Sequence, residues 1–256
     1  MSSVWDSQQY LKFAGERTQP SIDLAARVTL AAPRRVIDLG CGPGNSTAVL
    51  AARWPQAEIT GLDNSREMLA QAKADHPDMR WIEGDIAGWQ AEQPYDLVFT
   101  NAALQWVPDH ARLMPALLAQ VAPGGALAVQ MPRNGDNPAH AAMRTVAAEG
   151  PWASRIARPR GNIAVEPPGF YYDLLRPLAK RFEVWETEYQ HVLADVPAIV
   201  EWVRGTGLRP YIDPLGPDER KEFLARYLAR LEQAYKPQAD GKVILPFRRL
   251  FFIASR

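Results

Sequence analysis

Residues 36–47 decide the fold, and they read Val-Ile-Asp-Leu-Gly-Cys-Gly-Pro-Gly-Asn-Ser-Thr. An apolar run ends at a carboxylate, Asp38, and glycines follow at the alternate positions 40, 42 and 44. Glycine lets the backbone turn sharply and approach a ligand closely, because no Cβ stands in the way. Ser46 and Thr47 then open a helix whose first amides lack partners within the helix. The stretch therefore predicts a strand, a ligand-binding turn and a helix.

The spacing of the glycines argues against a dinucleotide as the ligand. A dinucleotide turn has the pattern G-x-G-x-x-G, which counted from Gly40 and Gly42 requires a third glycine at position 45. This chain has Asn45 there, and its own pattern is D-x-G-x-G-x-G. That pattern resembles motif I of the S-adenosylmethionine-dependent methyltransferases, in which the loop cradles the amino-acid and ribose portions of the cofactor.

Composition limits the classes of protein that remain. The chain has 256 residues, of which 47% are hydrophobic, enough for one large α/β core with room for an inserted subdomain. Lys plus Arg and Asp plus Glu both total 29, so no general attraction to nucleic acid is expected. The single cysteine, Cys41, is interpreted as structural and fits a reducing compartment. We find no leader and no apolar run near ~20 residues, so we expect a cytoplasmic protein without membrane spans.

Strand-like and helix-like segments alternate from Val36 to Met131, which predicts a parallel sheet with helices on both faces. Apolar residues at helical spacing from Leu113 to Val121 predict a helix that the sequence Pro-Gly-Gly at 123–125 ends. Strands are expected at 36–39, 59–63, 79–82, 96–100 and 127–131.

The composition shifts after Met131. Residues 133–169 are rich in Pro, Gly, Asn and Arg, with one helical stretch near 139–149. Two further strands are expected at 182–192 and 250–254, with helices between them over 196–235. A helical block inserted there is expected over the carboxyl edge of the sheet, where open α/β sheets bind ligands, although it could also be an extension that only covers the sheet. We interpret the chain, 1–256, as a single domain with N-terminal lid helices (1–30), a cofactor-binding half (33–131) and an inserted helical cap (194–241).

Polar side chains fall at the ends of four successive expected strands: Asp38, Asp63, Asp85 and Asn101. Each has an ordinary explanation, since Asp and Asn are common in turns. In register with the glycine turn, however, the series resembles a class I S-adenosylmethionine-dependent methyltransferase. The resemblance implies a Rossmann-like, mostly parallel seven-stranded sheet with helices on both faces. It also implies S-adenosyl-L-methionine as the cofactor and S-adenosyl-L-homocysteine as its product.

The same resemblance implies roles for the residues that bind the cofactor. Asp63 would accept hydrogen bonds from both ribose hydroxyls, Asp85 would bind the adenine amino group, and the Ile86 amide would contact the ring edge. Met68 would pack on an adenine face, or it is a core methionine of its helix. Asp38 is expected to order the loop. The remaining residues assigned to the cofactor are Gly40, Gly42, Asn64, Asn101 and Trp5.

The substrate is expected to be a small molecule. The chain continues Thr-Asn-Ala-Ala-Leu at 100–104, without the D/N-P-P-Y/F/W motif that holds an exocyclic amine of a base. Segments near the N-terminus, at 101–110 and at 202–210 resemble a group within the family that esterifies a carboxylate of a small tricarboxylate. Two alternatives remain open at this point. The acceptor could be another small molecule, such as a quinone precursor, or the chain could bind the cofactor without catalysis.

A carboxylate acceptor needs no catalytic side chain and no metal. Its unperturbed pKa is about 4, so it is ionised at neutral pH without a general base. The protein must still hold the carboxylates that do not react, for which arginine is suited. Trp106 is expected to shape the pocket, and His110 is expected to begin a helix and not to act as a base. The candidates for contacts to the substrate carboxylates are Arg17, Arg209, Arg133, Tyr171 and Tyr172; the oligomeric state stays open.

Overall fold

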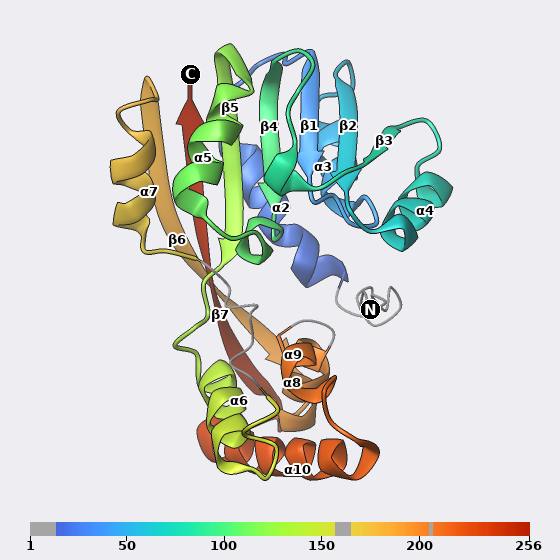
Figure 1. The fold of residues 1–256 in the computed structure, drawn as a ribbon, viewed down its shortest axis with the longest axis vertical. Helices are drawn as coiled ribbons and strands as arrows, with labels where there is room; N and C mark the ends of the chain where they lie inside the picture. Colours follow the sequence, from blue (N-terminus) through green and yellow to red (C-terminus); the bar gives the residue numbers. More distant parts are fainter. Residues whose placement is uncertain (1–13, 157–164, 205–206) are drawn as a thin grey trace.

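The computed structural model describes residues 14–156, 165–204 and 207–256 (Figure 1). Its centre is a seven-stranded sheet in the order β3-β2-β1-β4-β5-β7-β6. β7 runs antiparallel to both of its neighbours, and the other pairs are parallel. The fold expected from the sequence is confirmed. The strands are β1 (Arg35–Leu39), β2 (Glu58–Asp63), β3 (Arg80–Glu83), β4 (Tyr95–Asn101), β5 (Val121–Pro132), β6 (Arg181–Leu193) and β7 (Val243–Ser255).

Helices cover both faces of this sheet (Figure 1). α5 and α7 pack on one face, where Leu117 and Leu175 are buried, and α2 and α3 pack on the other, where Leu24 and Leu50 are buried. The helices of this half are α2 (Ala14–Arg27), α3 (Asn45–Arg53), α4 (Arg66–Asp75), α5 (His110–Ala119) and α7 (Pro168–Leu175), with short 3-10 turns η1 (Ile86–Gly88) and η2 (Leu104–Trp106). No helix in the described ranges is both long and apolar enough to cross a membrane.

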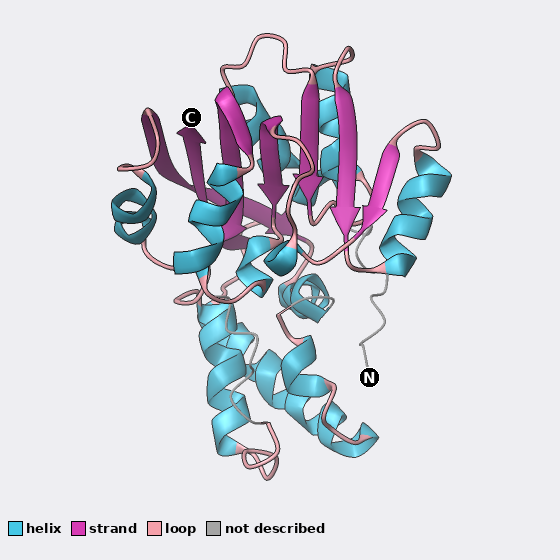
Figure 2. Ribbon diagram, turned by 45° about the horizontal axis from the view of Figure 1, so that its top comes forward, coloured by secondary structure: helices cyan, strands magenta, loops and turns pink. Residues whose placement is uncertain are grey.

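A second apolar core lies beyond the sheet. β6 and β7 have 13 residues each, a span of about 40 Å, and their far ends carry a helical block. In Figure 2 the arrowheads of the parallel strands point toward this block, which therefore lies at the carboxyl edge of the sheet, as the sequence predicted. The block consists of α6 (Pro138–Glu149), α8 (Val196–Arg204), α9 (Arg209–Ile212) and α10 (Pro217–Ala234).

The prediction for residues 121–127 was wrong. α5 ends at Ala119, and Val121 already belongs to β5, where it pairs with Tyr95. The register then shifts, and Leu97 pairs with Ala126. The Pro-Gly-Gly sequence is thus a bulge within a strand and not the end of a helix, with Gly124 at φ +83°. The helical spacing led to a wrong prediction because a bulge adds residues to one strand and interrupts the alternation of apolar and polar side chains that is typical of a strand.

Other boundaries also differ from the prediction. β7 begins at Val243, seven residues before the expected start at 250, and α7 was not expected. The helical stretch expected over 196–235 is divided into three helices. α6 comes from the segment before β6 but shares one apolar core with α8 and α10. The helical block is therefore built from two separate stretches of sequence.

Candidate active site

The turn between β1 and α3 is held by a buried carboxylate. Asp38 is fully buried and accepts hydrogen bonds from Ser46 Oγ at 2.6 Å and Thr47 Oγ1 at 2.7 Å. These bonds tie the last residues of β1 to the first turn of α3. Burial raises the pKa of Asp38 from 3.8 to about 6, although the two hydroxyl groups lower it. Asp38 thus orders the loop, as predicted.

The raised pKa of Asp38 predicts a pH-dependent stability. The unfolded chain releases this proton near pH 3.8 and the native protein near pH 6, so between these values the native state binds more protons and stability falls as pH rises. We expect the free energy of unfolding of wild type to fall by about 2 kcal/mol relative to Asp38→Asn between pH 4 and 6. Urea unfolding at several pH values measures this difference, with Asp78→Asn, at an exposed carboxylate, as the control. A difference that stays constant over this range would contradict the prediction.

Two glycines of the turn serve different purposes. Gly40 has φ +73°, and a Cβ on it would lie 2.2 Å from Ala103 Cβ, so the loop and the segment after β4 approach as closely as glycine allows. Gly42 has φ +55°, and a Cβ there would meet no atom within 4 Å. Gly40 is therefore required by packing. Gly42 leaves open space beside the loop, which is the kind of cradle a bound ligand fills.

The carboxylates at the ends of the next two strands are fixed by backbone amides. Asp63 accepts from Gly42 N through Oδ2 and from Ser65 N through Oδ1, each at 2.9 Å. Asp85 caps η1 by accepting from Ala87 N at 3.0 Å. Each carboxylate oxygen can accept a further hydrogen bond, so both side chains are oriented and still able to bind a ligand.

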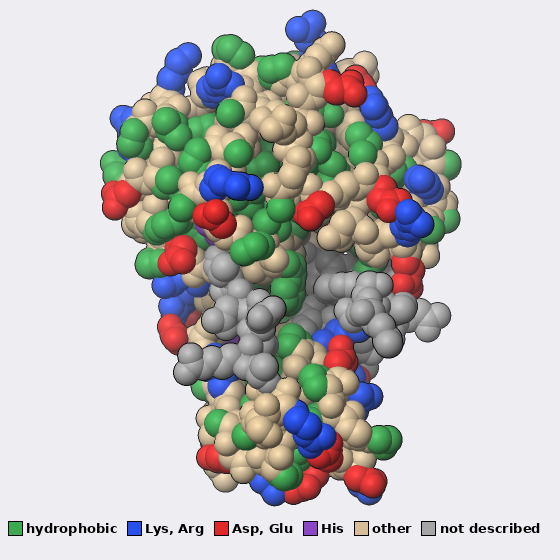
Figure 3. All heavy atoms as spheres, viewed as in Figure 1, with side chains coloured by type: hydrophobic (Ala, Val, Ile, Leu, Met, Phe, Trp, Pro, Cys, Tyr) green, Lys and Arg blue, Asp and Glu red, His purple; other side chains and the backbone are tan. Residues whose placement is uncertain are grey.

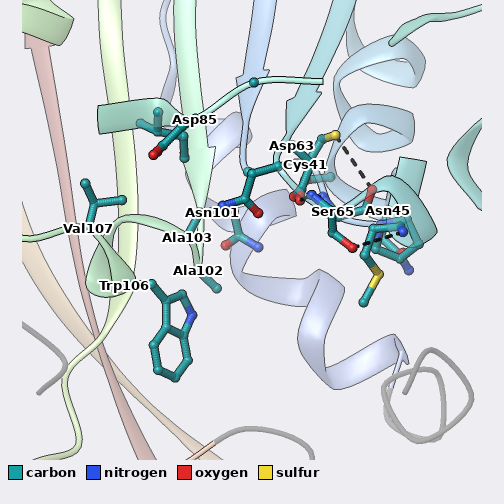
Figure 4. A pocket seen from close by; sticks show the side chains of 18 of the residues that line it. Cys41, Asn45, Asp63, Ser65, Asp85, Asn101, Ala102, Ala103, Trp106 and Val107 are labelled. Carbon is teal, nitrogen blue, oxygen red and sulfur yellow. Dashed lines mark hydrogen bonds between the residues drawn. The ribbon is translucent and has the colours of Figure 1, made fainter. Parts of the chain in front are cut away.

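These residues surround one cavity of about 620 Å³ at the carboxyl edge of the sheet. Figure 4 shows Asp63, Asn101 and Trp106 around it. A volume of this size is typical of sites for cofactors and other small molecules. The cavity brings together eight of the nine residues predicted to bind the cofactor: Gly40, Gly42, Asp63, Asn64, Met68, Asp85, Ile86 and Asn101. The ninth, Trp5, lies outside the described residues.

The segment after β4 forms the wall nearest the helical block. Asn101 Oδ1 is buried and has no hydrogen-bond partner among the described residues. The next residue, Ala102, has φ +54°, a conformation that is costly for a residue with a Cβ and is typical of functional sites. Trp106, in η2, lines the cavity and is 40% exposed. This wall therefore offers an unsatisfied acceptor and an exposed aromatic ring to a ligand.

The helical block contributes to the same cavity through α9. Arg209, Pro210 and Asp213 line it, and Arg209 Nε lies 3.4 Å from Asp213 Oδ2. The ion pair is half open to solvent, with side-chain exposures of 21% for Arg209 and 46% for Asp213. A guanidinium group thus faces the cavity from the side opposite the sheet. On the face of the molecule seen in Figure 1, Figure 3 shows acidic and basic side chains interspersed, without a patch of one charge.

The structure places three predicted substrate contacts away from the cavity. Tyr171 is fully buried in the core, where its hydroxyl group bonds His110 Nδ1 at 2.7 Å and accepts from Glu166 N at 3.1 Å. Tyr172, on α7, is 47% exposed, and its ring contacts that of Phe182. None of these tyrosine contacts is with a residue that lines the cavity.

The third predicted substrate contact that lies away from the cavity is Arg133, which pairs with Glu186 at 2.9 Å. Arg17 lies in α2, and its side chain is outside the described residues. His110 begins α5, as predicted, and is buried against Leu104 O and Tyr171. Its two ring nitrogens are both engaged, which fits a structural role.

Sequence reasoning missed the contribution of α2 to the cavity. Thr18 and Ser21 line it from this helix. Nothing in the local sequence distinguishes them from other small polar residues of a helix, since their position depends on how α2 packs across the sheet. The lid predicted at 1–30 had only indicated that this part of the chain would lie near the site.

Comparison with known families agrees with this geometry. The profile of a family described as a methyltransferase domain matches residues 36–125. Among solved structures, the YcgJ protein from Bacillus subtilis has a TM-score of 0.63 at 12% identity, covering 93% of this chain and 98% of that chain. Phosphoethanolamine N-methyltransferase 2 from Haemonchus contortus, solved in complex with S-adenosylhomocysteine, has a TM-score of 0.57 at 15% identity, covering 93% of this chain and 52% of that chain. At these identities the likeness shows the fold.

Curated relatives are much more similar in sequence. A trans-aconitate 2-methyltransferase from Rhodopseudomonas palustris (strain BisB18) is 55% identical, covering 98% of this chain and 99% of the relative. Another, from Azoarcus sp. (strain BH72), is 52% identical, covering 99% of both chains. These alignments include the helical block as well as the sheet.

Proposed function

The chain belongs to the trans-aconitate 2-methyltransferase family, and we propose that it transfers a methyl group from S-adenosyl-L-methionine to a carboxylate oxygen of trans-aconitate. The observation that carries this proposal is the shared cavity, in which the strand-end residues of the sheet face an arginine of the helical block. The family agrees with the group that the sequence resembled and disfavours a quinone precursor as the acceptor.

The residues present fit the cofactor. We propose that Asp63 binds the ribose hydroxyls, because its carboxylate is held in place by two amides and retains free lone pairs. We assign Asp85 and the Ile86 amide to the adenine, and Met68 to an adenine face. The methionine portion is assigned to Asn101 and Gly40. The residues Gly42 and Asn64, which line the same cavity, complete the proposed set.

The proposed methyl transfer requires alignment of the acceptor oxygen with the methyl group and the sulfur, and it does not require a general acid or base. When bound, the cofactor supplies a methyl group on a positively charged sulfur. The acceptor carboxylate is ionised at neutral pH, so the protein need not remove a proton. Charge is neutralised as the reaction proceeds, and the cavity walls contribute by orienting the acceptor and excluding water. We assign Trp106, which lines the same cavity as Asn101 and Arg209, to shaping the acceptor side.

Arg209 is the proposed clamp for a carboxylate that does not react. We expect Arg209→Lys to raise the KM for trans-aconitate about 10-fold and to leave the affinity for S-adenosyl-L-methionine unchanged, because lysine keeps the charge but loses the planar fork. Steady-state kinetics and calorimetry measure the two quantities. Arg226→Lys is the matched control, since Arg226 forms an ion pair with Glu222 on α10, outside the cavity. An unchanged KM in Arg209→Lys would remove Arg209 from the site.

We further propose that the chain is divided into a lid (1–30), a cofactor-binding half (33–131) and a cap (194–241). We also propose that the reaction takes place in the cytoplasm, on a small acceptor and not on nucleic acid. The equal numbers of acidic and basic residues argue against a nucleic-acid partner, and the single cysteine fits the cytoplasm. Arg17, in the proposed lid, remains a second candidate clamp.

A labelled methyl-transfer screen over di- and tricarboxylates tests the function. We expect trans-aconitate to be methylated fastest, with a rate that varies little from about pH 6 to 8, since the acceptor is already ionised. Binding of S-adenosyl-L-methionine without transfer to any acid of the panel would overturn the proposal and favour a binding protein without catalysis.

A further inference from the structure

One charged residue of the cavity wall has no role in the proposed reaction. Three carboxylates line the cavity, those of Asp63, Asp85 and Asp213, and among the described residues Arg209 is the only cation that does so. Asp63 and Asp85 are assigned to the cofactor. Asp213 is left over, although a carboxylate in this wall repels an acceptor whose own carboxylates are ionised at neutral pH. The presence of Asp213 therefore requires an explanation.

Asp213 engages the cation that the acceptor needs. It directly follows α9, four residues after Arg209, and its Oδ2 lies 3.4 Å from Arg209 Nε. Within the described part of the chain, the Arg209 side chain makes no other ion pair or hydrogen bond. A charged hydrogen bond is typically about 2.7–2.9 Å long, so this single contact is weak. The guanidinium group thus has a partner, but one that it can exchange.

The stability of α9 does not account for the pair. α9 has four residues, and the arginine precedes the acid, which is the less favourable order for two charges four positions apart on a helix. The Asp213 side chain is 46% exposed. An exposed carboxylate is hydrated when it loses its partner, so breaking the pair costs little.

We propose that Asp213 competes with the acceptor for Arg209 and is displaced by the carboxylate that does not react. This proposal rests on the proposed function. The acceptor must replace the contact with Asp213, and a carboxylate that engages the planar fork of Arg209 with both oxygens compensates for the loss. Asp213 therefore lowers the affinity of every acceptor that uses Arg209. The same carboxylate remains in the monoester product, so Asp213 also favours release of the product.

The sign of one change in affinity tests this role. Asp213→Asn keeps the size of the side chain and removes its charge. We expect it to lower the Kd of trans-aconitate by about 2- to 5-fold, the factor to which an exposed ion pair corresponds. Calorimetry on the complex with S-adenosyl-L-homocysteine measures this Kd without turnover. If Asp213 instead only oriented Arg209, the Kd would rise, and an unchanged or higher Kd would overturn the proposal.

Acceptors that lack one carboxylate show whether the competition is for Arg209. Itaconate, trans-glutaconate and mesaconate each lack a different carboxylate of trans-aconitate. The dicarboxylate that lacks the group bound by Arg209 is identified as the one whose Kd does not change in Arg209→Lys. Asp213→Asn should strengthen binding of the other two and have a much smaller effect on that one. An equal gain for all three would show a general effect of charge and overturn the proposal.

Two variants complete the comparison. Asp218→Asn makes the same change in net charge at an exposed position in the first turn of α10, outside the cavity, and should leave the Kd of trans-aconitate unchanged. Asp213→Glu keeps a carboxylate and should return the Kd toward that of wild type. Wild-type protein that does not methylate trans-aconitate would refute the proposed function, whereas active wild type with an unchanged Kd in Asp213→Asn would refute the competition alone.

Discussion

Asp63→Ala is expected to weaken binding of S-adenosyl-L-methionine by about 100-fold or more, with a smaller effect on folding. Its carboxylate is proposed to accept both ribose hydroxyls, and each hydrogen bond to a charged group contributes about 1.5–3 kcal/mol. The substitution also removes the acceptor that holds Gly42 N and Ser65 N, which loosens the glycine turn. Calorimetric titration with the cofactor measures the affinity.

Two further variants separate these contributions. Asp63→Asn keeps the size of the side chain and one acceptor oxygen but removes the charge, so its affinity should lie between those of wild type and Asp63→Ala. Asp75→Ala, at the exposed last residue of α4, is the control and should bind normally. A folded Asp63→Ala protein with unchanged affinity would exclude the ribose role.

Gly40→Ala is expected to destabilise the protein by about 2–5 kcal/mol. A left-handed backbone costs a residue with a Cβ about 1–2 kcal/mol, and overpacking adds about 1–3 kcal/mol. The second contribution arises because the new Cβ would lie 2.2 Å from Ala103 Cβ. Denaturant unfolding measures the loss. Any shift that relieves the overlap also moves Ala103 relative to the loop, so cofactor affinity should fall in the protein that remains folded.

Gly124→Ala isolates the backbone contribution. Gly124 has φ +83° in the bulge of β5, and a Cβ there would meet no atom within 4 Å. This control should cost only about 1–2 kcal/mol and leave cofactor binding unchanged. Equal losses of stability in the two variants would show that the loop relaxes away from Ala103 without cost.

The cofactor half of the site was predictable because its determinants are local. The glycine turn, the Asp38 hydrogen bonds to Ser46 and Thr47, and the Ser65 cap of α4 each involve residues within ten positions of one another. Parallel strands place their carboxyl ends at one edge, so Asp63, Asp85 and Asn101 meet there once the strands are recognised. The bulge of β5 was missed for the opposite reason, since it depends on pairing with Tyr95 in another strand.

The acceptor half was less predictable because its residues are placed by packing between distant segments. Tyr171 and Arg209 both looked able to bind a carboxylate, but α7 turns Tyr171 into the core, whereas α9 turns Arg209 toward the cavity. α6 joins the helical block although β6 separates it from α8 in the chain. No pattern of residue types distinguishes these outcomes.

The sequence by itself therefore determined the fold, the cofactor and the strand-end residues of the candidate site. Hydrogen bonds over a few residues and the left-handed backbone of glycine are sufficient to specify those features. Only the tertiary structure decided that Arg209 lines the cavity and that Arg249 is buried in the sheet. Gln130 and Arg249 are 119 positions apart, and they meet because β7 returns antiparallel beside β5 in one particular register. A shift of that register by one residue would turn Arg249 to the opposite face of the sheet.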